Sequence, residues 1–204
     1  MPDDCALAVP TSTNVVGYWY PPYPDFGALQ VTLLPMVVQA IAVVVLIVLG
    51  VSGIAKIINP APTAGALKGA NLPSSESTAR ALGITEVATS GLGLVLGGLW
   101  LVPASLIYAG FGGFVLYALR ARVPLQSCGC FGSDDTPPTR IHLIFNAVAA
   151  VSLAIAASSG SISVPWRSAP QESLLYIGLA GLGAYLSYQL LALLPSALGT
   201  SRRR

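Results

Sequence analysis

Charged side chains are scarce in this sequence. Only 9% of its 204 residues are Asp, Glu, Lys or Arg, whereas 54% are hydrophobic, and soluble globular domains usually carry roughly 25% charged residues. This shortage excludes an ordinary soluble domain. The net charge of +2 is too small, and the basic residues are too dispersed, for a nucleic-acid partner. The composition instead indicates a protein whose main partner is a lipid bilayer.

Residues that usually carry chemistry are also few. The chain has one histidine and three cysteines, and it contains neither a complete four-ligand metal spacing nor a phosphate-binding glycine loop. We therefore expect no bound metal ion and no cofactor.

The apolar residues gather in runs long enough to cross a bilayer, which takes ~20 helical residues. The run at 26–55 has no charged residue. The run at 81–119 is about twice the length of one crossing, which predicts two helices joined near 100–103. Further runs at 141–158 and 173–194 bring the predicted number of transmembrane helices to five. The fold class expected is an all-α polytopic bundle.

Polar segments rich in turn-forming residues separate these helices. Residues 56–80 and 120–140 each contain several prolines, so both are predicted to be loops. The chain then divides into a Pro- and Tyr-rich extracytoplasmic segment, a four-helix membrane core, and a fifth helix with a basic cytoplasmic tail. These three parts cover residues 1–28, 29–158 and 159–204.

Lys and Arg residues are retained on the cytoplasmic side of membrane proteins, so their distribution predicts orientation. With five helices and an external N-terminus, only Arg167 among the ten basic residues lies outside. The amino-acid composition is rich in Ala, Gly, Leu and Val and poor in Lys, which is typical of high-GC bacteria. We therefore expect a multi-pass protein of the bacterial cytoplasmic membrane, with its N-terminus outside and its C-terminus inside. The residues placed inside are Lys56, Lys68, Arg80, Arg120, Arg122, Arg140, Arg202, Arg203 and Arg204.

One charged residue, Glu86, lies within a predicted helix, about one turn from its start. A carboxylate inside a bilayer is costly unless it is paired, protonated or next to a polar cavity. Lys56, at the inner end of the first helix, is at a compatible depth for an ion pair, as is Arg80. The alternative is a proton relay or ligand site in which His142 is the second titrating group. Asn146, one turn beyond His142, could share a polar cluster with it.

The most specific local motif is Cys128-Gly129-Cys130 in the second predicted loop. A C-x-C pair can form a strained disulfide that exchanges readily with other thiols, with His142 as the candidate proton acceptor. Two thiolates together with His142, or with Asp134 and Asp135, could instead hold a soft metal ion. A third interpretation is that both thiols stay reduced and the segment is a tight turn that packs on the helix ends.

Four features together resemble the MauE-type methylamine-utilisation membrane proteins, which are related to the DoxX-like four-helix proteins. The resemblance covers roughly residues 30–158. It implies a four-helix core that assists thiol oxidation or disulfide formation in exported partners, with Cys128 and Cys130 as the redox element. The features are the segment 52–60 (SGIAKIINP), Glu86, Arg120 and the segment 128–132 (CGCFG).

This chain departs from that pattern in its fifth helix, its N-terminal extension and a charge distribution that places the C-x-C motif inside. A redox enzyme for exported proteins needs its thiols outside, and Cys5 is predicted on the opposite face. The sequence alone therefore favours a non-catalytic accessory subunit that docks on and stabilises a larger membrane assembly, such as a transport complex. The alternatives are a MauE-type thiol redox helper and a small-solute transporter.

Overall fold

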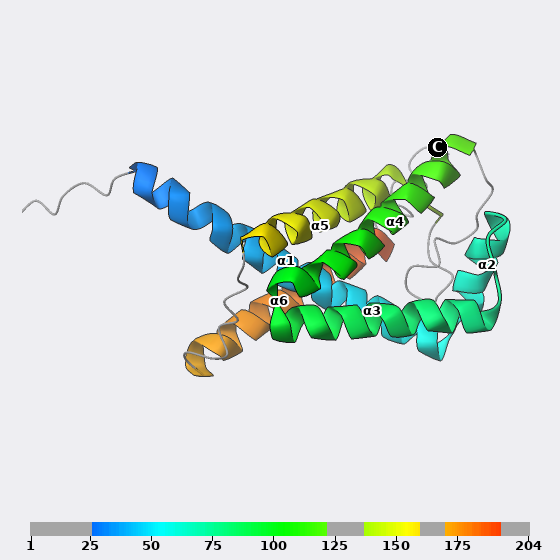
Figure 1. Ribbon diagram of the computed structural model, residues 1–204, viewed down its shortest axis with the longest axis horizontal. Helices are drawn as coiled ribbons and strands as arrows, with labels where there is room; N and C mark the ends of the chain where they lie inside the picture. Colours follow the sequence, from blue (N-terminus) through cyan, green and yellow to red (C-terminus); the bar gives the residue numbers. More distant parts are fainter. Residues whose placement is uncertain (1–25, 122–136, 160–169, 193–204) are drawn as a thin grey trace, which may run out of the picture.

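The computed structural model describes the backbone of residues 26–121, 137–159 and 170–192, and the side chains of residues 37–121, 137–159 and 177–191. Every regular element in these ranges is a helix (Figure 1). In chain order they are α1 (Phe26–Ile58), α2 (Ala61–Gly69), α3 (Glu76–Leu96), the 3-10 turn η1 (Gly98–Trp100), α4 (Leu101–Ala121), α5 (Arg140–Ser158) and α6 (Pro170–Ala192).

Helices α1, α3, α4 and α5 form a four-helix bundle in which α1 is central. Helix α1 packs on α3, α5 and α6, while α4 packs on α5 and α3. The segments long and apolar enough to cross a membrane are Val37–Ile58, Glu76–Leu96, Gly98–Ala121 and Arg140–Ser158. The prediction of an all-α polytopic membrane protein is thus confirmed. The described apolar part of α6, Ile177–Leu191, is shorter, so a fifth crossing stays a prediction.

The bundle core is made of small and branched apolar side chains, and most large ones on the outer faces are exposed. Tyr108 enters this core from α4 and donates a 2.6 Å hydrogen bond to the carbonyl oxygen of Val45 on α1. Apolar outer faces suit a hydrocarbon solvent, because lipid tails are as apolar as the side chains they touch.

The first predicted loop, 56–80, contains a helix, so this prediction was wrong. Helix α2 begins directly after Pro60, with Pro62 in its first turn. Proline is tolerated there because first-turn amides have no helical partner. Thr63, Ala64 and Ala66 are buried as α2 packs on α3.

Helix α3 begins five residues before the predicted start at Ala81. Ser75 caps it, because its hydroxyl accepts a 3.1 Å hydrogen bond from the backbone N–H of Thr78. The polar residues that suggested a loop are therefore a helix-initiating sequence. As a consequence Glu86 lies midway along α3, deeper than the single turn predicted.

The turn between α3 and α4 lies at Gly97 to Trp100, slightly earlier than predicted. Gly97 and Gly98 have φ values of 62° and 54°, which glycine adopts without steric cost. Pro103, read from the sequence as part of the break, lies in the first turn of α4.

Helices α1 and α3 approach closely at a pair of glycines. A Cβ atom added to Gly53 would lie 2.6 Å from the carbonyl oxygen of Gly83, and one added to Gly83 would lie 2.6 Å from the carbonyl oxygen of Gly53. Small residues permit such backbone contact in membrane bundles. This contact holds the Lys56 turn of α1 against the Glu86 turn of α3.

Candidate functional site

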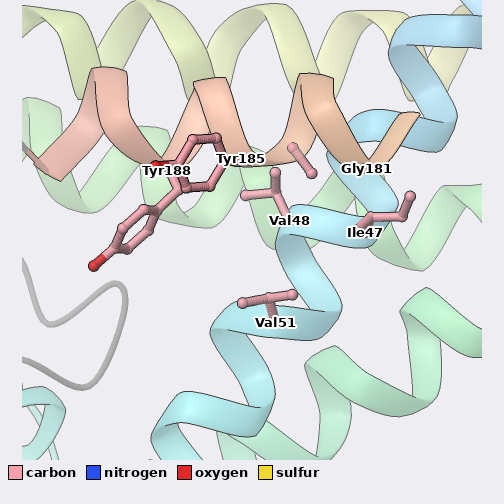
Figure 2. A pocket seen from close by; sticks show the side chains of 7 residues that line it. Ile47, Val48, Val51, Gly181, Tyr185 and Tyr188 are labelled. Carbon is pink, nitrogen blue, oxygen red and sulfur yellow. The ribbon is translucent and has the colours of Figure 1, made fainter. Parts of the chain in front are cut away.

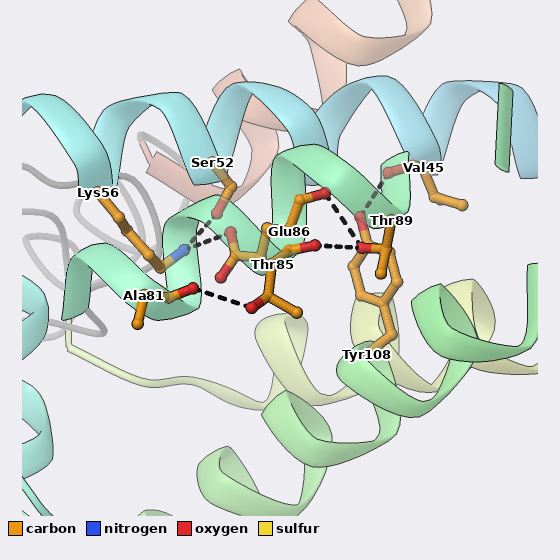
Figure 3. Close-up of polar contacts among 8 residues, drawn as sticks. All are labelled: Val45, Ser52, Lys56, Ala81, Thr85, Glu86, Thr89 and Tyr108. Atoms are coloured by element: carbon orange, nitrogen blue, oxygen red, sulfur yellow. Dashed lines mark hydrogen bonds and ion pairs between the residues drawn. The ribbon is translucent and has the colours of Figure 1, made fainter. Parts of the chain in front are cut away.

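A charged cluster lies inside the bundle between α1 and α3. The Nζ atom of Lys56 lies 2.9 Å from Oε2 of Glu86, and it donates a second hydrogen bond, of 2.5 Å, to Oγ of Ser52 (Figure 3). Lys56 is 1% exposed and Glu86 0% exposed. The structure therefore brings together the two residues that the sequence suggested as an intramembrane ion pair. Arg80, the other candidate, instead lies 3.7 Å from Glu76 on the exposed side of α3.

The second carboxylate oxygen of Glu86, Oε1, differs from the first in its hydrogen bonding. Among the described residues, Oε1 of Glu86 is the buried side-chain oxygen or nitrogen atom that has no hydrogen-bond partner. An unsatisfied buried acceptor costs about 1–3 kcal/mol, and more when it is charged. The cluster is therefore not optimised for stability alone.

An aromatic ring on α4 completes the surroundings of the ammonium group. Nζ of Lys56 lies 5.3 Å from the centroid of the Phe111 ring, within the range of a cation–π interaction. Three helices thus contribute to holding the charge of Lys56 inside the bundle.

His142 lies in the first turn of α5, where the sequence predicted it, but its side chain is only 2% exposed. Its Nδ1 atom accepts a 3.3 Å hydrogen bond from the backbone N–H of Thr139, and the Thr139 hydroxyl lies 2.9 Å from the same atom. Thr139 and His142 thus form a reciprocal cap at the start of α5. The Asn146 side chain donates a 2.7 Å hydrogen bond to the His142 carbonyl oxygen.

A small cavity lies beside His142. It has a volume of about 30 Å³, and its lining includes Ser52 from α1, Tyr108 and Phe111 from α4, and His142 and Asn146 from α5. A polar cavity needs roughly 10–15 Å³ to hold one water molecule. Ser52, which accepts a hydrogen bond from Lys56, and His142 therefore border one small space with room for a water molecule, although neither Lys56 nor Glu86 lines it.

Lys56 and His142 lie toward the end of the bundle where α1 ends, α3 begins, α4 ends at Ala121 and α5 begins at Arg140, whereas Glu86 lies midway along α3. The chain between α4 and α5 contains Cys128 and Cys130, which lie outside the described residues, as does Cys5. Asp134 and Asp135 also lie outside them. Within the described part of the chain, no group of three or more His, Cys, Asp or Glu side chains could hold a metal ion.

Some members of the cluster were not identified from the sequence. Ser52 precedes Lys56 by four residues, a spacing that places both side chains on one helical face, so this signal was available. Tyr108, Phe111 and Thr139 gave no comparable signal, because their roles depend on how α4 and α5 pack against α1.

A protein-family model described as methylamine utilisation protein MauE matches residues 34–159. The match contains Lys56, Glu86, His142 and the C-x-C motif, and it ends just after α5, so α6 lies outside it. No curated protein and no solved structure matches the chain.

Proposed function

The chain belongs to the methylamine utilisation protein MauE family, and from this premise we propose that it is a membrane thiol–disulfide redox helper. The observation that carries the proposal is the buried Lys56–Glu86 pair, together with the buried His142 at the start of α5, the helix that follows the segment with the C-x-C motif in the chain. We prefer this function to the accessory-subunit role that the sequence favoured, and that role is kept below as a second candidate.

A purely structural scaffold has little use for such a cluster. Replacing a buried ion pair by apolar residues of similar volume is often neutral or stabilising, and ionisable groups inside membranes usually serve a function. Here the pair is buried, one carboxylate oxygen lacks a partner among the described residues, and Ser52 and His142 border one small cavity. These properties support a role in proton or thiol chemistry.

The proposed reaction is disulfide exchange between the C-x-C pair and a partner protein. The Cys128–Cys130 disulfide is attacked by a partner thiolate, a mixed disulfide forms, and the second partner thiolate releases Cys128 and Cys130 as a dithiol. Two electrons and two protons pass from the partner to the cysteines. His142 is the proposed proton acceptor in this exchange.

Trapping the intermediate tests this function. In a Cys5→Ser background, a Cys130→Ser variant leaves the Cys128 thiolate able to attack the disulfide of the oxidised partner, which is the reverse of the proposed exchange, and Cys130 is no longer present to resolve the mixed disulfide. We expect a mixed disulfide with another protein, seen as a reductant-sensitive band on a non-reducing gel. The matched control is the variant that also carries Cys128→Ser. Identical gels for the two variants would contradict the proposal.

We also propose the orientation with the N-terminus outside. Support comes from the described basic residues, which all lie toward the end of the bundle where α1 and α4 end: Lys56, Lys68, Arg80, Arg120 and Arg140. The positive-inside tendency then places this end, and the redox chemistry, in the cytoplasm of a bacterial cell. In the same arrangement residues 1–28 lie outside and residues 193–204 inside.

A second candidate function, docking on a larger membrane assembly, is supported by α6. This helix lies outside the family match and packs mainly on α1. Between them lies an open apolar groove of about 380 Å³, lined by Ile47, Val48, Val51, Gly181, Ala184, Tyr185 and Tyr188 (Figure 2). We propose that an apolar transmembrane helix of the partner occupies it.

Filling the groove tests the docking proposal. A Cβ atom at Gly181 or at Gly178 meets no heavy atom within 4 Å, but only Gly181 lines the groove. We expect Gly181→Leu to lower co-purification of a large assembly in mild detergent, while Gly178→Leu leaves it unchanged. Equal recovery of the assembly with both variants would rule out this groove as the contact.

A further inference from the structure

A cavity of about 200 Å³ lies between α2, α3 and α4, beside the last turn of α1. Most of its lining is apolar. Helix α2 supplies Ala66 and Leu67, α3 supplies Leu82, and α4 supplies Phe111 and Phe114. The short helix that the sequence did not predict thus forms one wall of this cavity.

The polar side chains of the described lining, Lys56 and Thr63, are already engaged. Lys56 pairs with Glu86 and donates a hydrogen bond to Ser52, and Thr63 also has a partner. A buried water molecule needs two to four polar partners, whereas an apolar cavity of about 150 Å³ is known to stay dry and to bind benzene. The lining therefore favours an apolar occupant.

The cavity extends along the bundle, from the end that carries α2 into the apolar span of α4. Leu72, which is exposed, lines it between α2 and α3 at that end (Figure 1). Gly110, also exposed, lines it midway along α4. At the helical rise of 1.5 Å per residue, Gly110 lies about 16 Å from the last residue of α4, roughly half of the ~30 Å hydrocarbon core. The cavity thus runs in the direction of a phospholipid acyl chain and reaches the surface at two depths.

Positive charge is in excess at the end of the bundle that carries α2. The side chains that the structure describes include five basic and two acidic ones, which leaves an excess of three positive charges. Both acidic side chains, Glu76 and Glu86, are already paired with basic ones. Lys68 directly follows the lining residue Leu67 on α2 and is exposed. Basic residues at a membrane surface attract anionic lipids, so the charge here is complementary to a negative headgroup.

We propose that this cavity holds one acyl chain of an anionic phospholipid whose headgroup lies beside Lys68. The acyl chain extends from α2 toward Gly110, where an added Cβ atom would meet no heavy atom within 4 Å. Helix α2 packs mainly on α3, so the lipid adds a contact between α2 and α4. The inference depends on the position of the chain in the membrane and not on the redox function.

The test uses the full-length protein in phosphatidylcholine liposomes that contain a trace of phosphatidylglycerol with a diazirine in one acyl chain. We expect light-induced crosslinks in the peptides of α2 or α4 that line the cavity, and their displacement by unlabelled phosphatidylglycerol. Gly110→Leu should lower this crosslinking about tenfold, because its side chain overpacks the filled site. Gly113→Leu is the matched control, since Gly113 is also exposed on α4 with open space at its Cβ but does not line the cavity.

The headgroup is tested by placing the same diazirine chain on phosphatidylcholine. We expect the phosphatidylglycerol probe to crosslink about fivefold more than the phosphatidylcholine probe, and Lys68→Met to remove this preference. Arg140→Met should keep it, because Arg140 is exposed at the start of α5, a helix that contributes no residue to the described lining.

Equal crosslinking of Gly110→Leu and Gly113→Leu, or crosslinks confined to α5 and α6, would overturn the site. Equal crosslinking by the two probes, or a preference that Lys68→Met retains, would overturn the anionic lipid as its occupant. Lys68 is exposed, so its variant tests the proposal even if Gly110→Leu fails to fold. None of these readouts uses Cys128 or Cys130, so the result is independent of the proposed redox function.

Discussion

Removing one or both partners of the buried ion pair should separate the contribution of the pair to stability from the contribution of the pair to chemistry. In Lys56→Met, the Glu86 carboxylate stays fully buried but loses its 2.9 Å contact with the ammonium group. Oε1 already lacks a partner among the described residues, so neither oxygen would face a cation. Breaking a buried pair in this way costs about 3–5 kcal/mol. We expect a loss of that size in the free energy of unfolding.

The double variant Lys56→Met/Glu86→Met provides the contrast. Two apolar side chains of similar volume replace the pair, and such replacements are often neutral or stabilising. We therefore expect the double variant to unfold within about 1 kcal/mol of the parent protein. If the cluster serves redox chemistry, the double variant should be stable yet lose mixed-disulfide formation.

The assay is equilibrium unfolding in detergent micelles, followed by far-ultraviolet circular dichroism. Lys68→Met, which removes an exposed positive charge from α2, is the control and should change stability little. A Lys56→Met protein as stable as this control would refute the reasoning, because it would mean that Glu86 does not depend on Lys56. A double variant as unstable as Lys56→Met would refute the coupling between the two side chains.

Three further substitutions test the packing around the cluster in the same unfolding assay. Gly83→Ala should cost about 1–3 kcal/mol because its Cβ would lie 2.6 Å from a backbone oxygen of α1, whereas Gly91→Ala, with open space on the same helix, should be neutral or slightly stabilising. Ser75→Ala removes the cap of α3 and should cost about 1 kcal/mol, with faster amide exchange in the first turn of α3. Tyr108→Phe removes a buried hydrogen bond to α1 and should lower the free energy of unfolding by about 1 kcal/mol. If none of the three substitutions lowered the free energy of unfolding, the contacts described here would be contradicted.

The membrane-crossing core could be predicted from the sequence because long apolar runs constrain a chain strongly. The segments α1, α4 and α5 lie close to their predicted positions for this reason. The prolines misled the prediction at α2, since Pro60 and Pro62 were taken as helix breakers although they lie at a helix start. Ser75 and Glu76 were likewise taken as part of a loop, so the predicted start of α3 was too late. Local capping chemistry, which apolar patterning does not report, accounts for both differences.

The candidate site was only partly predictable. Glu86 and Lys56 drew attention because charge is rare in the helices. The depth of Glu86 and the burial of His142 could not be predicted, because they depend on where α3 begins and on how α5 packs against α1. Phe111 and the cavity beside α2 follow from helix packing and have no signature in the sequence.

The measurement that most directly tests the central claim is the oxidation state of Cys128 and Cys130 in intact cells, in a Cys5→Ser background. Cells are quenched with acid, free thiols are blocked, and the remaining thiols are tagged after reduction with a reagent that adds mass. The account predicts a disulfide fraction in the parent protein that changes markedly in Lys56→Met/Glu86→Met at equal protein level. Two cysteines that are always reduced, in both proteins and under oxidative challenge, would contradict a redox function.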